Sequence, residues 1–406
     1  MGGEWPVGWT RMTLADTGKW LSGGTPSTAN AEYWDGDIPW ISAASLKTFR
    51  IAKSDRGLTE LGARSGSRLV DAGAVLFVVR GMSLKSEFRI GVAGRRVAFG
   101  QDCKAIIAAD GIDPVFLAHA IQARTSQILS MVEETSHGTG RLDTERLQEI
   151  EIGIPSVSEQ QRIVAAHAVI ERRIAALERE TQKRASVLEA LVAARLHRYS
   201  GISGTLRQVS ESIDAGITLG PQRTPRGNVA EYLRVANVRK GVIDVADLAE
   251  MEEEAKDRPR YELVVGDALV VEGHANPEEI GRCAVVGPKE SGLLYQNHLF
   301  RVRFSQVIPE FGMLWMNSET VRSYWKTRCA TSSGLYTVNR EMLADVPFPK
   351  VRRSEQDELL RVWRSGLCII RQMWLRVEKL RVVQHGIMED LLAGDFCGRE
   401  VCESLR

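Results

Sequence analysis

Short apolar runs alternate with long amphipathic stretches along the chain, and this order occurs twice. The apolar runs are rich in β-branched or aromatic residues and are bounded by glycine or charge; examples are GAVLFVVRG from Gly73, CKAIIAAD from Cys103, ALVVEG from Ala268 and HLFRVRF from His298. Such runs predict short strands. Each half of the chain is therefore expected to begin with a strand-rich domain.

The amphipathic stretches predict two long helices. One begins at Ser158-Glu159 and extends to about His197, and the other begins at Ser354-Glu355 and extends to about Leu392. In each, a serine precedes an acidic residue and a proline lies shortly upstream, as at a helix start. Apolar residues recur at coiled-coil spacing: Ile163, Ile170, Ile174 and Leu177 in the first helix, and Leu367, Ile370, Trp374 and Val377 in the second. We expect the helices to pack antiparallel, with one globular domain at each end.

The two halves are copies of one plan. Leu147 and Leu343, and likewise the triplets beginning at Ser158 and Ser354, are 196 residues apart. Upstream, DIPWISAASLK aligns with EYLRVANVRKG, which places Arg234 at the position of Trp40. The pattern predicts an α+β fold with domains at 1–155 and 203–350, a central helix within 156–202, and a C-terminal helix and tail at 351–406.

Composition favours an ordinary soluble protein with a weak overall field. The 406 residues exceed one ordinary core, and the formal net charge is +1, so nucleic-acid binding would rest on local basic patches. The N-terminus has neither the basic nor the apolar region of a secretory signal, and no apolar run reaches membrane-spanning length. These features predict a cytoplasmic protein. The six cysteines lack zinc-site spacing.

Catalytic motifs are missing from the sequence. It contains no GxxxxGK[ST], no HExxH and no GxSxG pattern. NPEE at Asn276 begins like the NPP-aromatic motif of amino-group methyltransferases but lacks its second proline and its aromatic residue. The chain is therefore interpreted as a binder, with no metal and no cofactor of its own. A catalytic methyltransferase or nuclease fragment with an unfamiliar motif is the alternative in another class.

Basic clusters recur in both strand-rich domains and predict contacts with DNA. Arginine and lysine suit phosphate contacts, whereas asparagine suits adenine and arginine suits guanine. The candidate DNA-binding residues are Ser42, Lys47, Arg80, Ser83, Lys85, Arg89 and Arg141 in the first half, and Asn237, Arg239, Lys240, His274, Asn276, Tyr336 and Arg340 in the second. Arg223 and Arg226 lie just before the second cluster and extend it.

The opening segment GGTPSTANAEYWDGDIPW, Gly23 to Trp40, raises a separate question because it is aromatic and lacks lysine and arginine. The turn at Gly23–Pro26 is expected either to approach the DNA or to fold beneath the recognition face. The aromatic residues with Pro39 are interpreted as a small core. That core would hold the loop from Ser42 to Lys47 towards a groove of the DNA.

Four stretches together resemble the specificity subunit of a type I restriction–modification enzyme. They are the opening GW…SGGTPST…YWDGDIPWISAASLK, the helix start GRLDTERLQEIEIGIPSVSEQQRIV, the head of the second half AEYLRVANVRKGVID, and the degenerate second helix start VNREMLADVPFPKVRRSEQDELL. In this order, and duplicated, they cover nearly the whole chain.

The resemblance implies two target-recognition domains, each of which reads one half of an asymmetric bipartite site in double-stranded DNA. The helix pair would set the gap between the half-sites and bind two methylation subunits, which two restriction subunits join in a restricting system. S-adenosylmethionine, ATP and magnesium would be used by those partners, and this chain would not be an enzyme. A DNA-binding scaffold of another phage-defence system stays open as an alternative.

Overall fold

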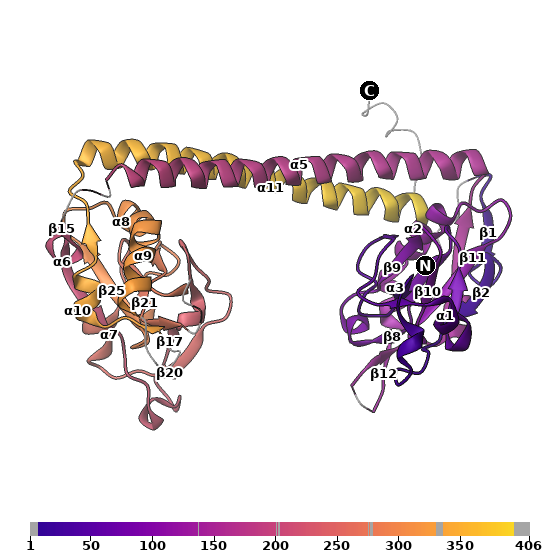
Figure 1. Ribbon diagram of the computed structural model, residues 1–406, viewed down its shortest axis with the longest axis horizontal. Coiled ribbons are helices and arrows are strands. Elements are labelled where there is room, and N and C mark those ends of the chain that lie inside the picture. Colours follow the sequence, from indigo (N-terminus) through magenta and orange to yellow (C-terminus); the bar gives the residue numbers. More distant parts are fainter. Residues whose placement is uncertain are drawn as a thin grey trace. The chain divides into compact units, whose positions relative to one another are not determined.

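The computed structural model describes residues 7–136, 138–199, 201, 204–274, 276, 279–329 and 336–393; residues 1–6, which belong to the N-terminus interpreted above, lie outside that part. The chain divides into two compact units. Unit 1 comprises Met1–Glu178 and Leu375–Arg406, and unit 2 comprises Arg179–Trp374. Figure 1 shows that each unit contains a mixed α+β body and part of both long helices. The domain limits given above stay predictions.

The body of unit 1 is built on two main sheets, of order β2-β11-β7-β9-β4 and β5-β3-β10-β6, and two smaller ones, β1-β14 and β12-β13-β8. Its strands are β1 Thr10–Thr13, β2 Gly18–Ser22, β3 Trp34–Ile41, β4 Arg50–Ile51, β5 Gly57–Leu58, β6 Arg68–Val70, β7 Val75–Val78, β8 Arg80–Gly81, β9 Ile90–Ala93, β10 Val97–Phe99, β11 Cys103–Ala108, β12 Glu133–Glu134, β13 Gly140–Arg141 and β14 Glu151–Ile154. Its helices are η1 Ala31–Tyr33, α1 Glu60–Gly66, η2 Met82–Lys85, α2 Pro114–Gln122, α3 Thr125–Ser130 and α4 Thr144–Gln148.

The body of unit 2 repeats this plan with main sheets of order β16-β25-β21-β23 and β20-β17-β24, and with smaller sheets β15-β27, β18-β19 and β22-β26. Its strands are β15 Gly204–Thr205, β16 Ser210–Ala215, β17 Val229–Leu233, β18 Val238–Arg239, β19 Val242–Ile243, β20 Ala249–Glu252, β21 Ala268–Val271, β22 Gly273–His274, β23 Cys283–Val285, β24 Leu294–Tyr295, β25 Leu299–Phe304, β26 Tyr336–Thr337 and β27 Pro347–Phe348. Its helices are α6 Leu206–Val209, η3 Pro221–Arg223, η4 Val235–Asn237, α7 Asp257–Tyr261, α8 Pro309–Met316, α9 Glu319–Arg328 and α10 Arg340–Ala344.

Strand register establishes which residues of the two units are equivalent. In unit 1 the parallel pair β3–β10 aligns Ile41 with Phe99, and in unit 2 the parallel pair β17–β24 aligns Leu233 with Tyr295. Tyr232 is therefore the counterpart of Trp40, and Arg234 is the counterpart of Ser42. The sequence alignment that placed Arg234 at the position of Trp40 is wrong by two residues. It matched residue types, whereas structural equivalence is set by the hydrogen-bonded register of the strands.

The two long helices are α5, Val157–His197, and α11, Arg353–Ala393, close to their predicted bounds. Within unit 1 they are antiparallel, since Glu178 of α5 pairs with Arg381 and His167 hydrogen-bonds Gln384. Within unit 2, Leu188 faces Gly366 and Arg195 lies 4.0 Å from Glu358, which is again antiparallel. No described helix is both long and apolar enough to cross a membrane.

Burial follows a heptad pattern in both helices but corrects part of the predicted stripe. In α5, Ile163 and Ile174 are buried as expected. In α11, Met373 and Val377 are buried, whereas Leu367 and Trp374 are 42% and 40% exposed. The contact line of α11 passes through Gly366 and Met373, one residue before each predicted position. A glycine at a helix contact has no apolar side chain, so the apolar pattern of the sequence does not reveal this contact line.

One buried glutamine in each unit anchors a long helix to the body. Gln160 accepts a hydrogen bond from the Asp113 amide, 2.7 Å away, at the start of α2. Its amide nitrogen donates to the carbonyl oxygens of Gly111 and Pro155 at 3.0 and 2.9 Å. Gln356 repeats the arrangement with Ile308, before α8, and Val351. The repeated Ser-Glu-Gln triplet is thereby explained: its glutamine fixes each helix to its body.

Candidate nucleic-acid interface

A basic edge of unit 1 gathers most of the candidates from the first half of the chain. Arg80 in β8 and Arg141 in β13 are exposed and lie directly opposite each other in an antiparallel ladder. Ser83 and Lys85 follow in η2, where Lys85 pairs with Glu134 of β12 at 2.9 Å. Figure 1 shows β8 and β12 at the end of unit 1 that lies away from α5. This edge projects exposed cations from short strands, as a DNA-reading surface requires.

The loop from Ser42 to Lys47 lies beside this edge. The Arg89 guanidinium donates to the carbonyl oxygen of Ala43 at 3.2 Å and pairs with Glu87. A Cβ on Gly81 of β8 would lie 3.4 Å from that of Ala43, so loop and ladder are in contact. Ser42 is engaged within the loop through Ser45, whereas Lys47 is exposed. The structure thus brings the loop into contact with this edge, and the expectation that the loop faces a DNA groove stays a prediction.

The opening segment forms the small core behind that loop. The rings of Trp34 and Trp40 meet edge to face with centroids 5.4 Å apart, and the Arg56 guanidinium lies 3.6 Å from the Trp34 ring centroid. Trp40 donates through its indole nitrogen to the Gly24 carbonyl at 3.2 Å. A Cβ on Gly23 would lie 2.1 Å from the Gly100 carbonyl oxygen. The turn therefore folds beneath the domain surface, and the aromatic residues are structural, as interpreted from the sequence.

Asn237 does not belong to the candidate surface. It is 4% exposed, and its side-chain nitrogen donates to the carbonyl oxygens of Asp244 and Asp247, each 2.9 Å away. Its side-chain oxygen accepts from the Arg234 amide at 2.8 Å. Its counterpart in unit 1, Ser45, likewise accepts from the Ser42 amide. Both side chains hold the same turn, and Asn237 has no free edge to present to a base.

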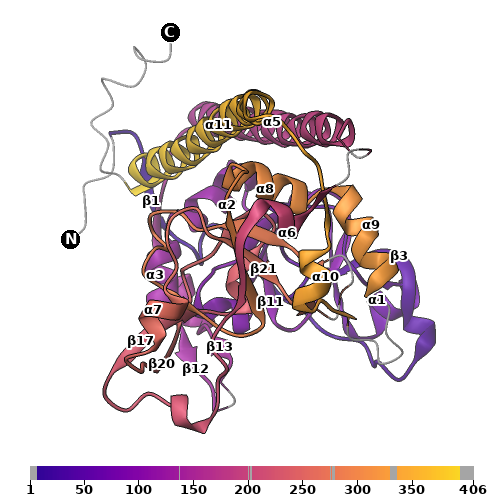
Figure 2. The ribbon, with the colours of Figure 1, turned by 90° about the vertical axis from the view of Figure 1, so that its left-hand side faces the viewer.

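Arg239 and Lys240 lie at the β18–β19 hairpin of unit 2. They precede the Gly241 turn, which lines a cavity with Met313 of α8 and Trp363 of α11. Figure 2 shows α8 between the sheets of unit 2 and the long helices. Arg239 pairs with Asp244 at 3.0 Å. The structure places this basic pair at the β18–β19 hairpin, next to the cavity that Met313 and Trp363 line.

The β22–β26 ladder is the unit 2 counterpart of the basic edge. It pairs His274 with Tyr336 and Gly273 with Thr337, and Tyr336 is described by its backbone alone. The Asn276 amide donates to the His274 imidazole at 3.0 Å, and Arg340 is exposed at the start of α10, four residues after Tyr336. The structure therefore brings Asn276 to His274, which is paired with Tyr336, while Arg340 is placed near them by chain position alone.

Arg223, grouped with the basic cluster above, is a structural residue. It is buried, and its guanidinium donates to Asp257 at 3.0 Å and to the Glu252 carbonyl at 3.1 Å. Burial by itself would raise the pKa of Asp257, but the hydrogen bonds from Arg223 and from the Glu254 amide, together with the charges of Arg223 and Lys256, lower that pKa below its usual value. The pair is internal and unavailable for phosphate contacts.

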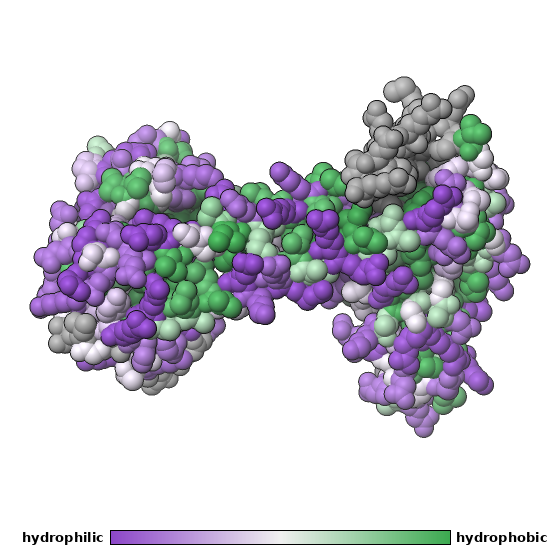
Figure 3. Space-filling view, turned by 90° about the horizontal axis from the view of Figure 1, so that it is seen from above, coloured by the Kyte–Doolittle hydropathy of each residue, from purple (hydrophilic) through white to green (hydrophobic). Residues whose placement is uncertain are grey.

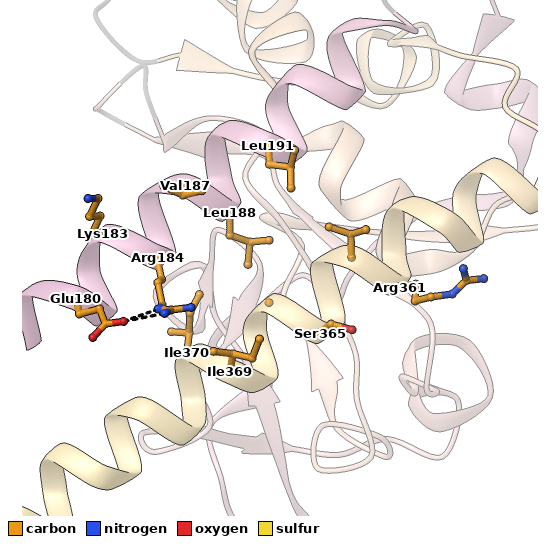
Figure 4. A pocket seen from close by; sticks show the side chains of 12 residues that line it. Glu180, Lys183, Arg184, Val187, Leu188, Leu191, Arg361, Ser365, Ile369 and Ile370 are labelled. Atoms are coloured by element: carbon orange, nitrogen blue, oxygen red, sulfur yellow. Dashed lines mark hydrogen bonds and ion pairs between the residues drawn. The ribbon is translucent and has the colours of Figure 1, made fainter. Parts of the chain in front are cut away.

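An apolar groove along the helix pair of unit 2 is a second candidate surface. Its volume is about 700 Å³, and its apolar lining comes from α5 and α11: Val187, Leu188, Leu191, Val362, Ile369 and Ile370. Figure 4 shows Leu188 and Leu191 pointing towards α11, with Glu180 and Arg184 paired at the rim. In the space-filling view of Figure 3, apolar and charged residues alternate on the helices. The groove was not predicted from the sequence, because its lining residues, Gly366 among them, form no distinctive motif.

Two histidines fill the space between α2, α5 and α11 in unit 1. His119 is 4% exposed, stacks on Phe49 at 4.3 Å and lies 3.9 Å from the ring centre of His167. Burial, and then the neighbouring His167, lower the pKa of His119 to about 3. Burial also lowers the pKa of His167. Neutral imidazoles therefore suit this site. Among the described residues, no group of three or more histidine, cysteine or acidic side chains is arranged to hold a metal ion.

Comparisons with known proteins give matches to about two fifths of the chain. Residues 6–186 match the family model of the type I restriction modification DNA specificity domain. The chain is 33% identical over 163 residues to the EcoR124I/EcoR124II specificity subunit of Escherichia coli, a match that covers 40% of each protein. It is 31% identical over 170 residues to the MjaIX specificity subunit of Methanocaldococcus jannaschii, which covers 40% of this chain and 37% of that one. The matched region thus spans about two fifths of these relatives.

Solved structures extend the likeness in fold to the whole chain. One, described as showing complex assembly and conformational transition of the type I R-M system, has a TM-score of 0.65 at 14% identity and covers 96% of this chain and 98% of its own. The HsdS subunit from Thermoanaerobacter tengcongensis has a TM-score of 0.52 at 14% identity, with 97% and 98% coverage. Residues 6–186 therefore match the type I restriction modification DNA specificity domain, and the chain as a whole shares the fold of these solved type I structures.

Proposed function

We propose that this chain is the DNA sequence-recognition subunit of a type I restriction–modification complex. The observation that carries the proposal is the contrast between the two equivalent ladders. The β8–β13 ladder presents Arg80 and Arg141, and the β22–β26 ladder has Gly273 and Thr337 at the same register positions. One framework with different exposed side chains suits two domains that read two different half-sites.

The long helices suit the role of a spacer in this proposal. Each is anchored to a body by a fully enclosed glutamine, so the helix start cannot swing freely. Half-sites read from one face of B-DNA lie about one helical turn apart, or about 34 Å. A 41-residue helix at about 1.5 Å per residue is long enough to hold two recognition domains at that spacing. The helix pair would then set the gap between the half-sites.

The partners in this proposal are double-stranded DNA and two methylation subunits, joined by two restriction subunits where the system cleaves. The apolar groove of unit 2, rimmed by Lys183, Arg184 and Arg361, is the surface we assign to one methylation subunit. The partners would use S-adenosylmethionine and ATP with magnesium. This chain would contribute recognition alone, inside the cytoplasm where its DNA lies.

Selection from random DNA tests the proposal. The full chain, in complex with its methylation subunits, is used to recover duplexes from a random library, which are then sequenced. The proposal predicts two short, different motifs separated by an unspecified gap of constant length. A single contiguous motif, or recovery without sequence preference, would refute it.

A further inference from the structure

The small sheet β12-β13-β8 carries a row of three charged side chains across one face. Arg141 is directly opposite Glu133 on one side and Arg80 on the other. Residues opposed in an antiparallel ladder have Cβ atoms about 4.5–5.5 Å apart and point to the same face. The order of groups across the row is therefore the Glu133 carboxylate, the Arg141 guanidinium and the Arg80 guanidinium. All three residues are exposed.

The two arginines of this row have no ion-pair partner among the residues that the structure describes. Within the described residues, neither guanidinium makes a hydrogen bond or an ion pair, although each is next to the other. The nearby carboxylates are engaged elsewhere, since Glu133 lies 3.4 Å from Arg146 and Glu134 lies 2.9 Å from Lys85. Like charges directly opposite in a ladder are destabilising. Glu133, opposite Arg141, offsets part of this repulsion, and Arg80 is paired in the ladder with Arg141 alone.

The second unit shows that the fold does not need this charge. Its equivalent ladder pairs Gly273 with Thr337 and keeps the same antiparallel register without a cation. The following strand ends are also held alike, since Leu142 donates to the Val79 carbonyl and Val338 donates to the Glu272 carbonyl. Two adjacent arginines without a side-chain bond to any described residue, at positions where the fold accepts neutral residues, indicate an external ligand.

We propose that this row makes unit 1 the reader of a G·C-containing half-site in the major groove; the inference rests on the function proposed above. Arginine bonds guanine through O6 and N7, and a carboxylate accepts from the cytosine N4 amine. A phosphate would suit the arginines but has no donor for the Glu133 carboxylate beside them, whereas a base amine has one. The major-groove edge of a G·C pair offers acceptors and a donor side by side, which matches the order of charges in the row.

The test uses the full chain in complex with its methylation subunits and the random duplex library. The wild type is expected to select guanine at one or two adjacent positions of one half-site. Arg80→Gln and Arg141→Gln should each lower the preference for guanine there by about tenfold, and leave the other half-site unchanged. Replacing that guanine with 7-deazaguanine, which lacks N7, should weaken wild-type binding by about tenfold and leave the matching variant unaffected.

Arg68→Gln is the matched control, because Arg68 is also exposed and in a strand but lies outside the row. It should keep the guanine preference, and an unchanged second half-site shows that each variant is folded. A selected bipartite site without guanine in either half overturns the inference and leaves the proposed function standing. Weaker binding to all sequences alike also overturns it, because that is the signature of phosphate contacts. Recovery without any sequence preference refutes both.

Discussion

Gln160 offers a direct test of how the long helix α5 is fixed to the body of unit 1. The change Gln160→Ala removes the partners of three backbone groups: the Asp113 amide and the carbonyls of Gly111 and Pro155. Gln160 is 0% exposed, so water cannot readily replace the lost bonds. At about 1 kcal/mol or more for each stranded buried group, the expected loss of stability is about 3 kcal/mol.

The assay is urea denaturation followed by hydrogen exchange and mass spectrometry, which reports on the two units separately. With a urea slope of about 2 kcal/mol per molar, a loss of 3 kcal/mol lowers the midpoint of unit 1 by about 1.5 M. The Asp113 amide should also lose protection already without urea. Gln161→Ala is the matched control, because Gln161 is the next residue and is exposed. It should change stability by no more than about 0.5 kcal/mol.

The reasoning is refuted if Gln160→Ala and Gln161→Ala shift the midpoint of unit 1 equally. Gln356 provides an independent repeat, since it is 2% exposed and bonds Ile308 and Val351 in unit 2. Gln356→Ala should destabilise unit 2 and spare unit 1. A change that destabilised both units to the same extent would show that the glutamines do not act locally.

Three further predictions concern pH, spacing and DNA affinity. The pKa of His119 is about 3 in the folded protein and 6.5 in the unperturbed residue, so the unfolded state binds a proton first as the pH falls. Unit 1 should therefore lose about 2–3 kcal/mol of stability between pH 6.5 and 4.5, measured by urea titration. His119→Phe should reduce that loss. Four residues inserted after Ala185, with a matching insertion in the facing part of α11, add about 6 Å and should lengthen the gap by one or two base pairs in DNA selection; an unchanged gap counts against the spacer role. Arg340→Ala should weaken DNA binding by about 1–3 kcal/mol in a titration at fixed salt, and unchanged affinity and preference would remove Arg340 from the interface.

The sequence predicted those features of the fold that depend on repetition and periodicity. The duplicated plan, the α+β class and both long helices follow from apolar spacing and from the recurring Ser-Glu-Gln triplet, and the helix bounds agree to within one residue. The small aromatic core around Trp34 and Trp40 was also predictable, because large apolar rings in a short segment are most often buried.

Tertiary context decided the rest. Asn237 and Arg223 are residue types that often bind DNA. In this fold, however, Asn237 donates to backbone carbonyls and Arg223 donates to Asp257. The neighbouring sequence does not predict these hydrogen-bond partners, which lie 7 to 34 residues along the chain from Asn237 or Arg223. Glu133 was missed for a related reason: a strand of two residues has no alternation to reveal it, and its place beside Arg141 depends on ladder register.

The central claim, that this chain selects the sequence at which its complex methylates DNA, is tested most directly by mapping N6-methyladenine across the genome of the source strain. The map is made with the gene intact, with the gene deleted, and with the Arg141→Gln variant. The account predicts that deletion removes one bipartite methylated motif and that the variant relaxes the guanine requirement in one half of it. An identical set of methylated motifs in all three strains, with the gene expressed, would contradict the account.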